Sequence, residues 1–141
     1  MAPEHDGPNV AADPDVIVVE ADVDLAAMLG YAFEMVDVRT RVYNDGSSAL
    51  DGILALPRSN KVRLLLLDVD LPGIDGHSIH ERIRSDRPRE FVAALISGGS
   101  NEADQLRALS AGAIDYLAKP VSIAVLRAKV QTWISALRGE T

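Results

Sequence analysis

Short apolar runs alternate along the chain with longer segments in which apolar residues recur every three or four positions. The short runs are rich in β-branched and aliphatic residues, which is typical of β-strands. They lie at positions 16–19, 38–43, 62–67, 91–96 and 114–117. The pattern therefore predicts a chain in which strands and helices follow one another.

The helical periodicity is clearest in the first and the last of the longer segments. Either Asp22 or Asp24 can cap the first of these helices. Its apolar stripe consists of Leu25, Met28, Leu29, Ala32, Phe33 and Val36. Ser122 is placed as the N-cap of the last helix. Its apolar side consists of Ile123, Leu126, Val130, Trp133, Ile134 and Leu137.

The third strand has no polar face. Residues 64–67 are consecutive leucines, which suits a central parallel strand covered by helices on both sides. Strands that alternate with helices through short connections predict an α/β fold with an open, doubly wound sheet of five parallel strands. Ligands bind such sheets outside the carboxyl ends of the strands, so the chemistry is expected there.

Length and composition narrow the class of protein further. The 141 residues suit one domain, which we place at 15–138, between a flexible N-terminal tail at 1–14 and a C-terminal tail at 139–141. Cysteine is absent, which excludes disulfides and thiol catalysis. No stretch has the length and apolar character of a membrane span or a signal peptide, so we expect a cytoplasmic protein without a membrane partner. The net charge of −7 argues against nucleic-acid binding by this chain.

Charged residues follow several of the predicted strands directly. Glu20 and Asp22 follow the first, Asp68 and Asp70 end or follow the third, and Lys119 follows the fifth. Carboxylates that converge at one edge of a sheet need a compensating cation. Lys119 supplies one positive charge, and Mg²⁺ is the natural second, because it prefers oxygen ligands and retains several waters.

These residue types are suited to phosphoryl transfer. A carboxylate such as Asp68 can attack phosphorus, provided that the charge on the transferred oxygens is neutralised. Lys119 and the hydroxyl of Ser97 would contact two of those oxygens, and the metal a third. Gly98 and Gly99 leave room for the phosphate.

The strand-end segments together resemble bacterial receiver domains of two-component response regulators. The segments are VIVVEADVDL, LLLLDVDLPGIDG, ALISGGS and GAIDYLAKPVS, and they occur in the order found in that family. The resemblance covers about residues 15–138. It implies the flavodoxin-like sheet of the CheY-like superfamily, with strand order 2-1-3-4-5 and helices on both faces.

The resemblance also implies a role for each matching position. Asp68 resembles the phospho-acceptor, Glu20 the first residue of the acidic pair, and Ser97, Tyr116 and Lys119 the switch hydroxyl, the switch aromatic and the family's lysine. Pro120 would follow a cis peptide bond. The implied partners are a sensor histidine kinase or a phosphotransfer protein. The implied output is docking of a downstream protein, or self-dimerisation, through the fourth helix, the fifth strand and the fifth helix.

The agreement breaks at one position. Where the family has its second acidic residue, a usual direct metal ligand, this chain has Ala21. We expect weakened Mg²⁺ binding, with Asp68 as one ligand. Our hypothesis is that Glu20, Asp22 or the Asp70 side chain partly replaces the missing ligand through water.

Several residues also have purely structural interpretations. Taken singly, Ser97 could cap a loop, Tyr116 could be a half-buried strand aromatic, and Lys119 a surface lysine. Asp75 can cap the helix after the LPGIDG turn. His77 and His80, three positions apart in that helix, are predicted to be solvent-exposed and without function. Gly112 is placed as the C-cap of the fourth helix.

Three functions compete. The first is a non-enzymatic receiver domain that takes a phosphoryl group on Asp68. The second, suggested by Ala21, is a binding module that keeps the receiver fold but works without phosphorylation. The third is a haloacid-dehalogenase-like phosphohydrolase, because DVD after a leucine run resembles that family's paired nucleophile and acid. It fits poorly, since that pair ends a first strand and the aspartates here follow the third.

Overall fold

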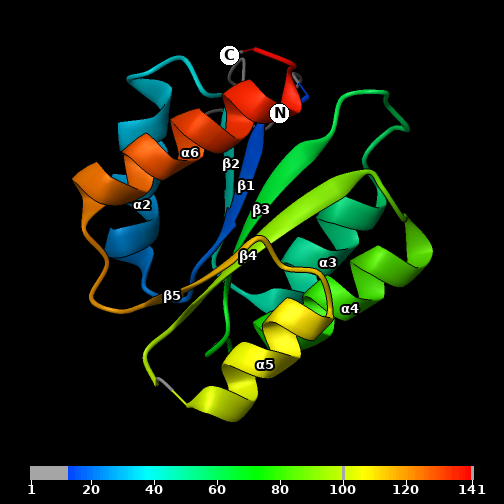
Figure 1. Ribbon diagram of the computed structural model, residues 1–141, viewed down its shortest axis with the longest axis vertical. Coiled ribbons are helices and arrows are strands. Elements are labelled where there is room, and N and C mark those ends of the chain that lie inside the picture. The colour runs from blue at the N-terminus through cyan, green and yellow to red at the C-terminus, as the bar shows by residue number, and fades with distance from the viewer. Residues whose placement is uncertain (1–12, 100, 141) are drawn as a thin grey trace, which may run out of the picture.

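The computed structural model describes residues 13–99 and 101–140, and their centre is a parallel five-stranded sheet in the order β2-β1-β3-β4-β5 (Figure 1). The strands are β1 (Val16–Val19), β2 (Thr40–Tyr43), β3 (Arg63–Asp68), β4 (Phe91–Ser97) and β5 (Asp115–Ala118). The helices are α2 (Val23–Glu34), α3 (Gly46–Leu54), α4 (Gly76–Asp86), α5 (Glu102–Ser110) and α6 (Ile123–Leu137). The predicted fold class and strand order are confirmed.

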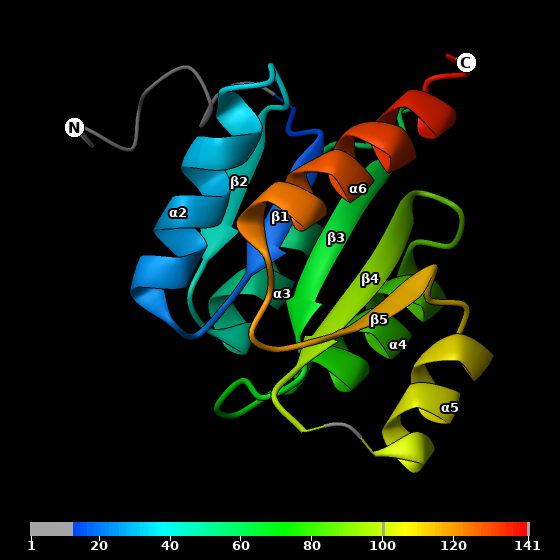
Figure 2. The same ribbon diagram turned by 60° about the vertical axis from the view of Figure 1, so that its left-hand side comes forward.

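Two layers of helices cover the sheet. In Figures 1 and 2, α2 and α6 lie on one face, and α3, α4 and α5 lie on the other. The leucine run of β3 serves both layers. Leu64 and Leu66 pack with α2 and α6, whereas Leu65 and Leu67 pack with α3, α4 and α5, and none of the four is more than 1% exposed. Burial on both faces explains why this strand shows no alternation.

Most of the predicted helix ends are confirmed. Of the two candidate caps for α2, Asp22 is the N-cap, and its side chain accepts a hydrogen bond from Leu25 N–H. Asp75 and Ser122 cap α4 and α6 in the same way. Gly112 follows α5 with φ of 93°, the left-handed conformation that glycine adopts most easily.

The structure differs from the sequence pattern at several positions in and beside α2. Met28, which was assigned to its apolar stripe, is 55% exposed. The second strand begins at Thr40 rather than at residue 38, because Asp37 has φ of 63° and the chain still turns there. The other strand ends agree with the prediction within one residue.

The prediction for His77 and His80 is wrong. Both are buried, at 3% and 7% exposure. They lie on the side of α4 that also carries Ile79 and Ile83, which pack against the sheet. A helical side that continues an isoleucine stripe faces the core whatever residues it carries, so the spacing was a signal for burial.

Residues 1–12 of the predicted tail at 1–14 lie outside the described residues. Asp13 and Pro14 are described, and Asp13 pairs with the fully buried Arg63, their side chains 2.9 Å apart. Within the described residues, none of the helices is both long and apolar enough to cross a membrane.

Candidate phosphorylation site

Four strands bring their carboxyl ends to one edge of the sheet, and the side chains predicted to carry the chemistry meet there. In Figure 2 the arrows of β1 and β3 point to this edge. Glu20 follows β1, Asp68 and Ser97 end β3 and β4, and Lys119 follows β5. The peptide bond between Lys119 and Pro120 is cis, as expected.

Lys119 joins the two buried carboxylates. Its Nζ lies 3.0 Å from Glu20 Oε2 and 3.4 Å from Asp68 Oδ2. Glu20 and Asp68 are each 2% exposed. Two carboxylates thus share one ammonium group in a region that is shielded from water.

The electrostatics of this group follow from its burial. Burial raises the pKa of Glu20 above its ordinary value, and the neighbouring charge of Asp68 raises it further against hydrogen bonds from Asp22 N–H and Lys119. Burial alone would lower the pKa of Lys119, but the carboxylates of Glu20 and Asp68 outweigh this effect and raise it. Lys119 therefore stays charged, while Glu20 lacks full compensation.

Asp70 connects the loop after β3 to the loop after β4. Its Oδ2 accepts a hydrogen bond from Gly98 N–H at 2.8 Å, and its own N–H donates to Asp68 Oδ1 at 2.9 Å. The Ser97 hydroxyl donates to the carbonyl of Gly99 and accepts from its N–H. The donors that would meet a phosphoryl group are therefore held by partners within the chain.

The donor set fits a divalent cation only in part. Glu20 Oε1 is buried and has no hydrogen-bond partner among the residues that the structure describes, so this carboxylate oxygen could bind a cation. Glu20 and Asp68 would hold Mg²⁺, which needs one or two carboxylates and otherwise keeps its waters. The side chains of Asp22 and Asp70 are engaged elsewhere, as a helix cap and as the partner of Gly98. Among the described residues, no group of three or more acidic, histidine or cysteine side chains is arranged for a metal.

Tyr116 lies beside the site on β5 and is half-buried. Its hydroxyl is buried, and none of the described residues forms a hydrogen bond with it. Its ring stacks on that of His77, with centroids 6.4 Å apart. His77 is thus a neighbour of the predicted switch residue that sequence reasoning missed.

Two further residues support the site without having been predicted. Asn44 follows β2, and its side-chain amide donates to the carbonyl of Glu20 at 3.0 Å. Gly76 begins α4 against the backbone of Asp68, where an added Cβ would lie only 2.5 Å from the Asp68 carbonyl oxygen. Gly76 is the last residue of the LPGIDG segment, so this glycine was visible in the sequence. Only a turn was inferred from that segment.

The fold and this strand-end cluster are those of a family of signalling domains. The family model "Response regulator receiver domain" matches residues 16–131, so the chain belongs to the receiver domains of two-component response regulators. Phosphorylation of an aspartate with Mg²⁺ is characteristic of this family, and its domains are signalling modules that are generally not enzymes. This membership leaves the phosphohydrolase alternative without support.

Similar proteins include regulators of several organisms. The chain is 31% identical over 125 residues to the transcriptional regulatory protein YxdJ of Bacillus subtilis, covering 89% of this chain and 52% of that protein. It is 34% identical over 132 residues to the probable methanogenesis regulatory protein FilR2 of Methanothrix harundinacea, covering 86% and 82%. The chain thus spans about half the length of YxdJ and of several other curated relatives.

Solved structures of receiver domains are also similar to this chain. The receiver domain of Francisella response regulator 1452 has a TM-score of 0.76 and 26% identity, covering 88% of this chain and 98% of that one. The CheY-like receiver domain from Methanospirillum hungatei, at 21% identity and a TM-score of 0.77, supports the fold alone, covering 92% and 100%.

Proposed function

We propose that Asp68 accepts a phosphoryl group from a histidine kinase or a phosphotransfer protein. The observation that carries the proposal is the contact of Lys119 with both Glu20 and Asp68, in register with Ser97 at the same sheet edge. A carboxylate oxygen of Asp68 attacks phosphorus, and the bond from phosphorus to the donor breaks, so that the electron pair leaves with the donor. Bound Mg²⁺ would neutralise charge on the transferred oxygens.

The chain's own groups hold the new phosphoryl oxygens. Lys119 turns from Asp68 to one oxygen as a point charge. The Ser97 hydroxyl releases the carbonyl of Gly99 and donates to another. Gly98 N–H is available once Asp70 releases it. The added charge is therefore sensed directly by the loop after β4, which leads into α5.

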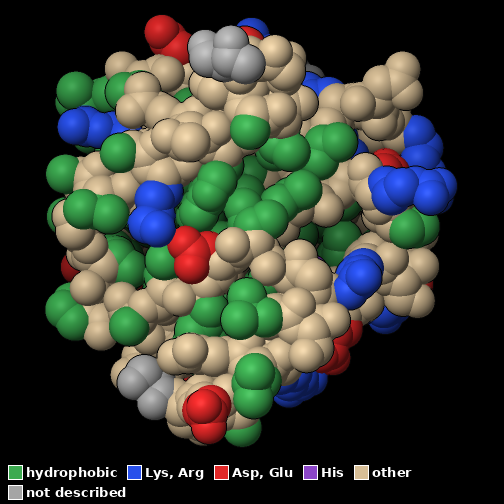
Figure 3. Space-filling view, in the orientation of Figure 1, with side chains coloured by type: hydrophobic (Ala, Val, Ile, Leu, Met, Phe, Trp, Pro, Cys, Tyr) green, Lys and Arg blue, Asp and Glu red, His purple; other side chains and the backbone are tan. Residues whose placement is uncertain are grey.

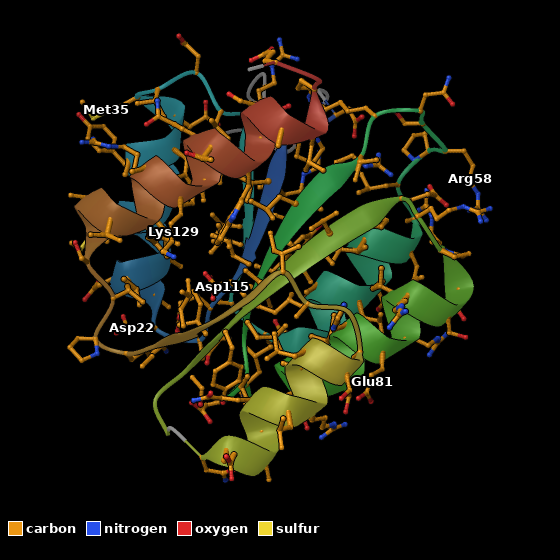
Figure 4. All side chains as sticks on the ribbon, viewed as in Figure 1. Asp22, Met35, Arg58, Glu81, Asp115 and Lys129 are labelled. Carbon is orange, nitrogen blue, oxygen red and sulfur yellow. The ribbon has the colours of Figure 1, made fainter. Side chains whose placement is uncertain are left out.

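The surface of α5, β5 and α6 is the proposed output, for a downstream protein or a second copy of the chain. Hydrophobic side chains gather beside β5 and α6 in Figure 3, and Figure 4 places Lys129 and Asp115 at their edge. This pair, 3.0 Å apart, joins α6 to β5. Exposed apolar side chains on the surface are Leu106, Leu109, Ile114 and Val125. Movement of the loop after β4 and of Tyr116 would rearrange these elements.

The test is intact mass after incubation with acetyl phosphate, with and without Mg²⁺. We expect a Mg²⁺-dependent gain of one phosphoryl group, which Asp68→Asn abolishes. Asp51→Asn is the matched control, because Asp51 is an exposed aspartate of α3, away from the site. A mass gain that survives Asp68→Asn would place the acceptor elsewhere.

A second candidate function rests on Ala21, which leaves the metal with two carboxylates. In this case the chain would be a binding module that works without phosphorylation. No mass gain at any Mg²⁺ concentration would favour it, and attention would move to the surface of α5, β5 and α6.

Ala21→Asp separates the two candidates. Ala21 N–H lies 3.4 Å from Asp68 Oδ2, so an aspartate here adds a third carboxylate to the site. We expect Mg²⁺ to bind roughly tenfold more tightly, because affinity follows ligand charge and number. Calorimetric titration of Mg²⁺ measures this, with Ala21→Asn as the uncharged control. Equal Mg²⁺ affinity in both variants would show that the missing carboxylate does not limit binding.

A further inference from the structure

A cavity of about 170 Å³ lies at the opposite end of the sheet from Asp68. It opens between α4, the start of β4 and the turn that joins α5 to β5. Its floor is apolar and consists of Leu65, Ile83, Phe91, Val92, Ala93 and Ile114. Its polar lining is entirely basic and consists of His80, Arg84, Arg87 and Arg89. The phosphorylation site uses none of these residues.

The positive charge of this lining is only partly compensated. The carboxylates of α4 and of the turn after it each have an arginine partner: Glu81 with Arg107 at 2.9 Å, Asp86 with Arg82 at 2.6 Å and Glu90 with Arg87 at 2.6 Å. Arg84 donates to the carbonyl of Ala111 and has no carboxylate partner among the described residues. The Arg89 side chain forms neither a hydrogen bond nor an ion pair with any residue that the structure describes. In a chain of net charge −7, two uncompensated arginines therefore meet at one cavity.

The third polar group of the cavity is His80, a histidine on α4. His80 is 7% exposed and makes no hydrogen bond within residues 13–99 and 101–140. Burial, together with the charge of Arg84, lowers the pKa of His80, so the imidazole is neutral at neutral pH and keeps one N–H donor. His80 thus brings to the cavity lining an N–H donor that no described residue engages.

Arg89 has a backbone conformation that is uncommon for its type. Its φ is 66°, in the left-handed region that residues other than glycine rarely adopt. Arg84 and Arg89 are exposed, whereas Leu65, Ile83 and Ala93 of the apolar lining are each no more than 1% exposed. The cavity is thus apolar at its floor and cationic at its rim.

We infer that this cavity binds a small organic anion, with its carboxylate or phosphate group at Arg84, Arg89 and His80 and a ring-sized apolar group on the floor. The size agrees, because an apolar protein cavity of about 150 Å³ holds one benzene molecule. The guanidinium group of arginine is suited to both a carboxylate and a phosphate. Such a ligand would touch α4 and the turn between α5 and β5, independently of any phosphorylation of Asp68.

The test is an amide NMR titration of the whole chain without Mg²⁺, using phenyl phosphate and benzoate as probes. Inorganic phosphate lacks the ring, and benzamide lacks the charge. We expect shifts of the Gly112 and Ile114 amides, with a dissociation constant of about 1 mM or below and about tenfold tighter than for the two incomplete probes. Binding of only one complete probe would identify the anionic group and still support the site.

The matched variants are Arg84→Gln with Arg89→Gln, against Arg82→Gln. All three arginines are exposed, so the fold should tolerate the changes, but Arg82 pairs with Asp86 and does not line the cavity. We expect the double variant to weaken binding about tenfold and Arg82→Gln to leave it unchanged. Equal binding of inorganic phosphate, equal loss in Arg82→Gln, or no shift at Gly112 and Ile114 would each overturn the proposal.

Discussion

Replacing Arg87 by alanine is expected to lower the free energy of unfolding by about 3–5 kcal/mol, because each buried carbonyl group that loses its donor costs about 1–3 kcal/mol. Arg87 is 4% exposed and holds both oxygens of Glu90. Its guanidinium also donates to carbonyls at the end of α3 and in the loop that follows it: Ile53, Leu54, Leu56 and Pro57. Helix ends leave such carbonyls without partners, so the change removes their donor. It also removes one of the arginine partners of Glu90, which keeps Arg58 and Arg63.

Urea unfolding measures this loss, and Arg82→Ala is its control. Arg82 lies on α4, which Arg87 follows directly, and pairs with Asp86, but 54% of its side chain is exposed. An exposed pair of this spacing is worth about 0.2–0.5 kcal/mol. If Arg87→Ala lowered the free energy of unfolding no more than Arg82→Ala, the buried contacts of Arg87 would contribute no net stability.

The sheet could be predicted because each strand carries its own signal. The leucine run of β3 shows burial on two faces without reference to any other part of the chain. The caps Asp22, Asp75 and Ser122 are local as well, since each contacts the N–H three positions later. Elements defined by local patterns are therefore the ones that the sequence predicts well.

Buried polar residues could not be predicted in this way, because their partners are distant in the chain. Arg63 has no exposed surface, and it is compensated by Asp13, 50 positions earlier, and by the ring of Phe91 at 4.7 Å. Composition places arginine at the surface unless such partners are known. The error for His77 has the same origin, because its ring partner Tyr116 is distant in the chain. For His80 the isoleucines of the same helix already indicated the buried side.

At the candidate site, backbone position was predictable and side-chain direction was not. Parallel strands place Glu20 and Lys119 at one edge although they are 99 positions apart, and the structure brings them together. Asp22 and Asp70 lie at the same edge, but their side chains turn to Leu25 N–H and Gly98 N–H. Strand order fixes the backbone position of a residue. Nearby backbone N–H groups then decide in which direction a short carboxylate side chain points.

Lys119→Met is expected to slow phosphorylation of Asp68 by about 100-fold or more, the usual effect of losing one donor to a developing anion. The same change should tighten Mg²⁺ binding by roughly tenfold, because Glu20 and Asp68 lose their ammonium partner and the cation takes its place. The variant is therefore expected to be phosphorylated more slowly although it binds Mg²⁺ more tightly. Mass spectrometry with acetyl phosphate measures the first, and calorimetric titration measures the second.

Saturating Mg²⁺ distinguishes the two possible roles of Lys119. If the lysine only neutralises Glu20 and Asp68, an excess of Mg²⁺ restores the rate in Lys119→Met. If it holds the phosphoryl group, the rate stays low when the metal is saturating, which is the result we expect. Lys61→Met is the matched control, because Lys61 pairs with Asp15 at 3.0 Å and its side chain is 25% exposed, against 24% for Lys119. An equal loss in Lys61→Met would mean that the effect comes from the removal of any partly buried lysine rather than from contact with the phosphoryl group.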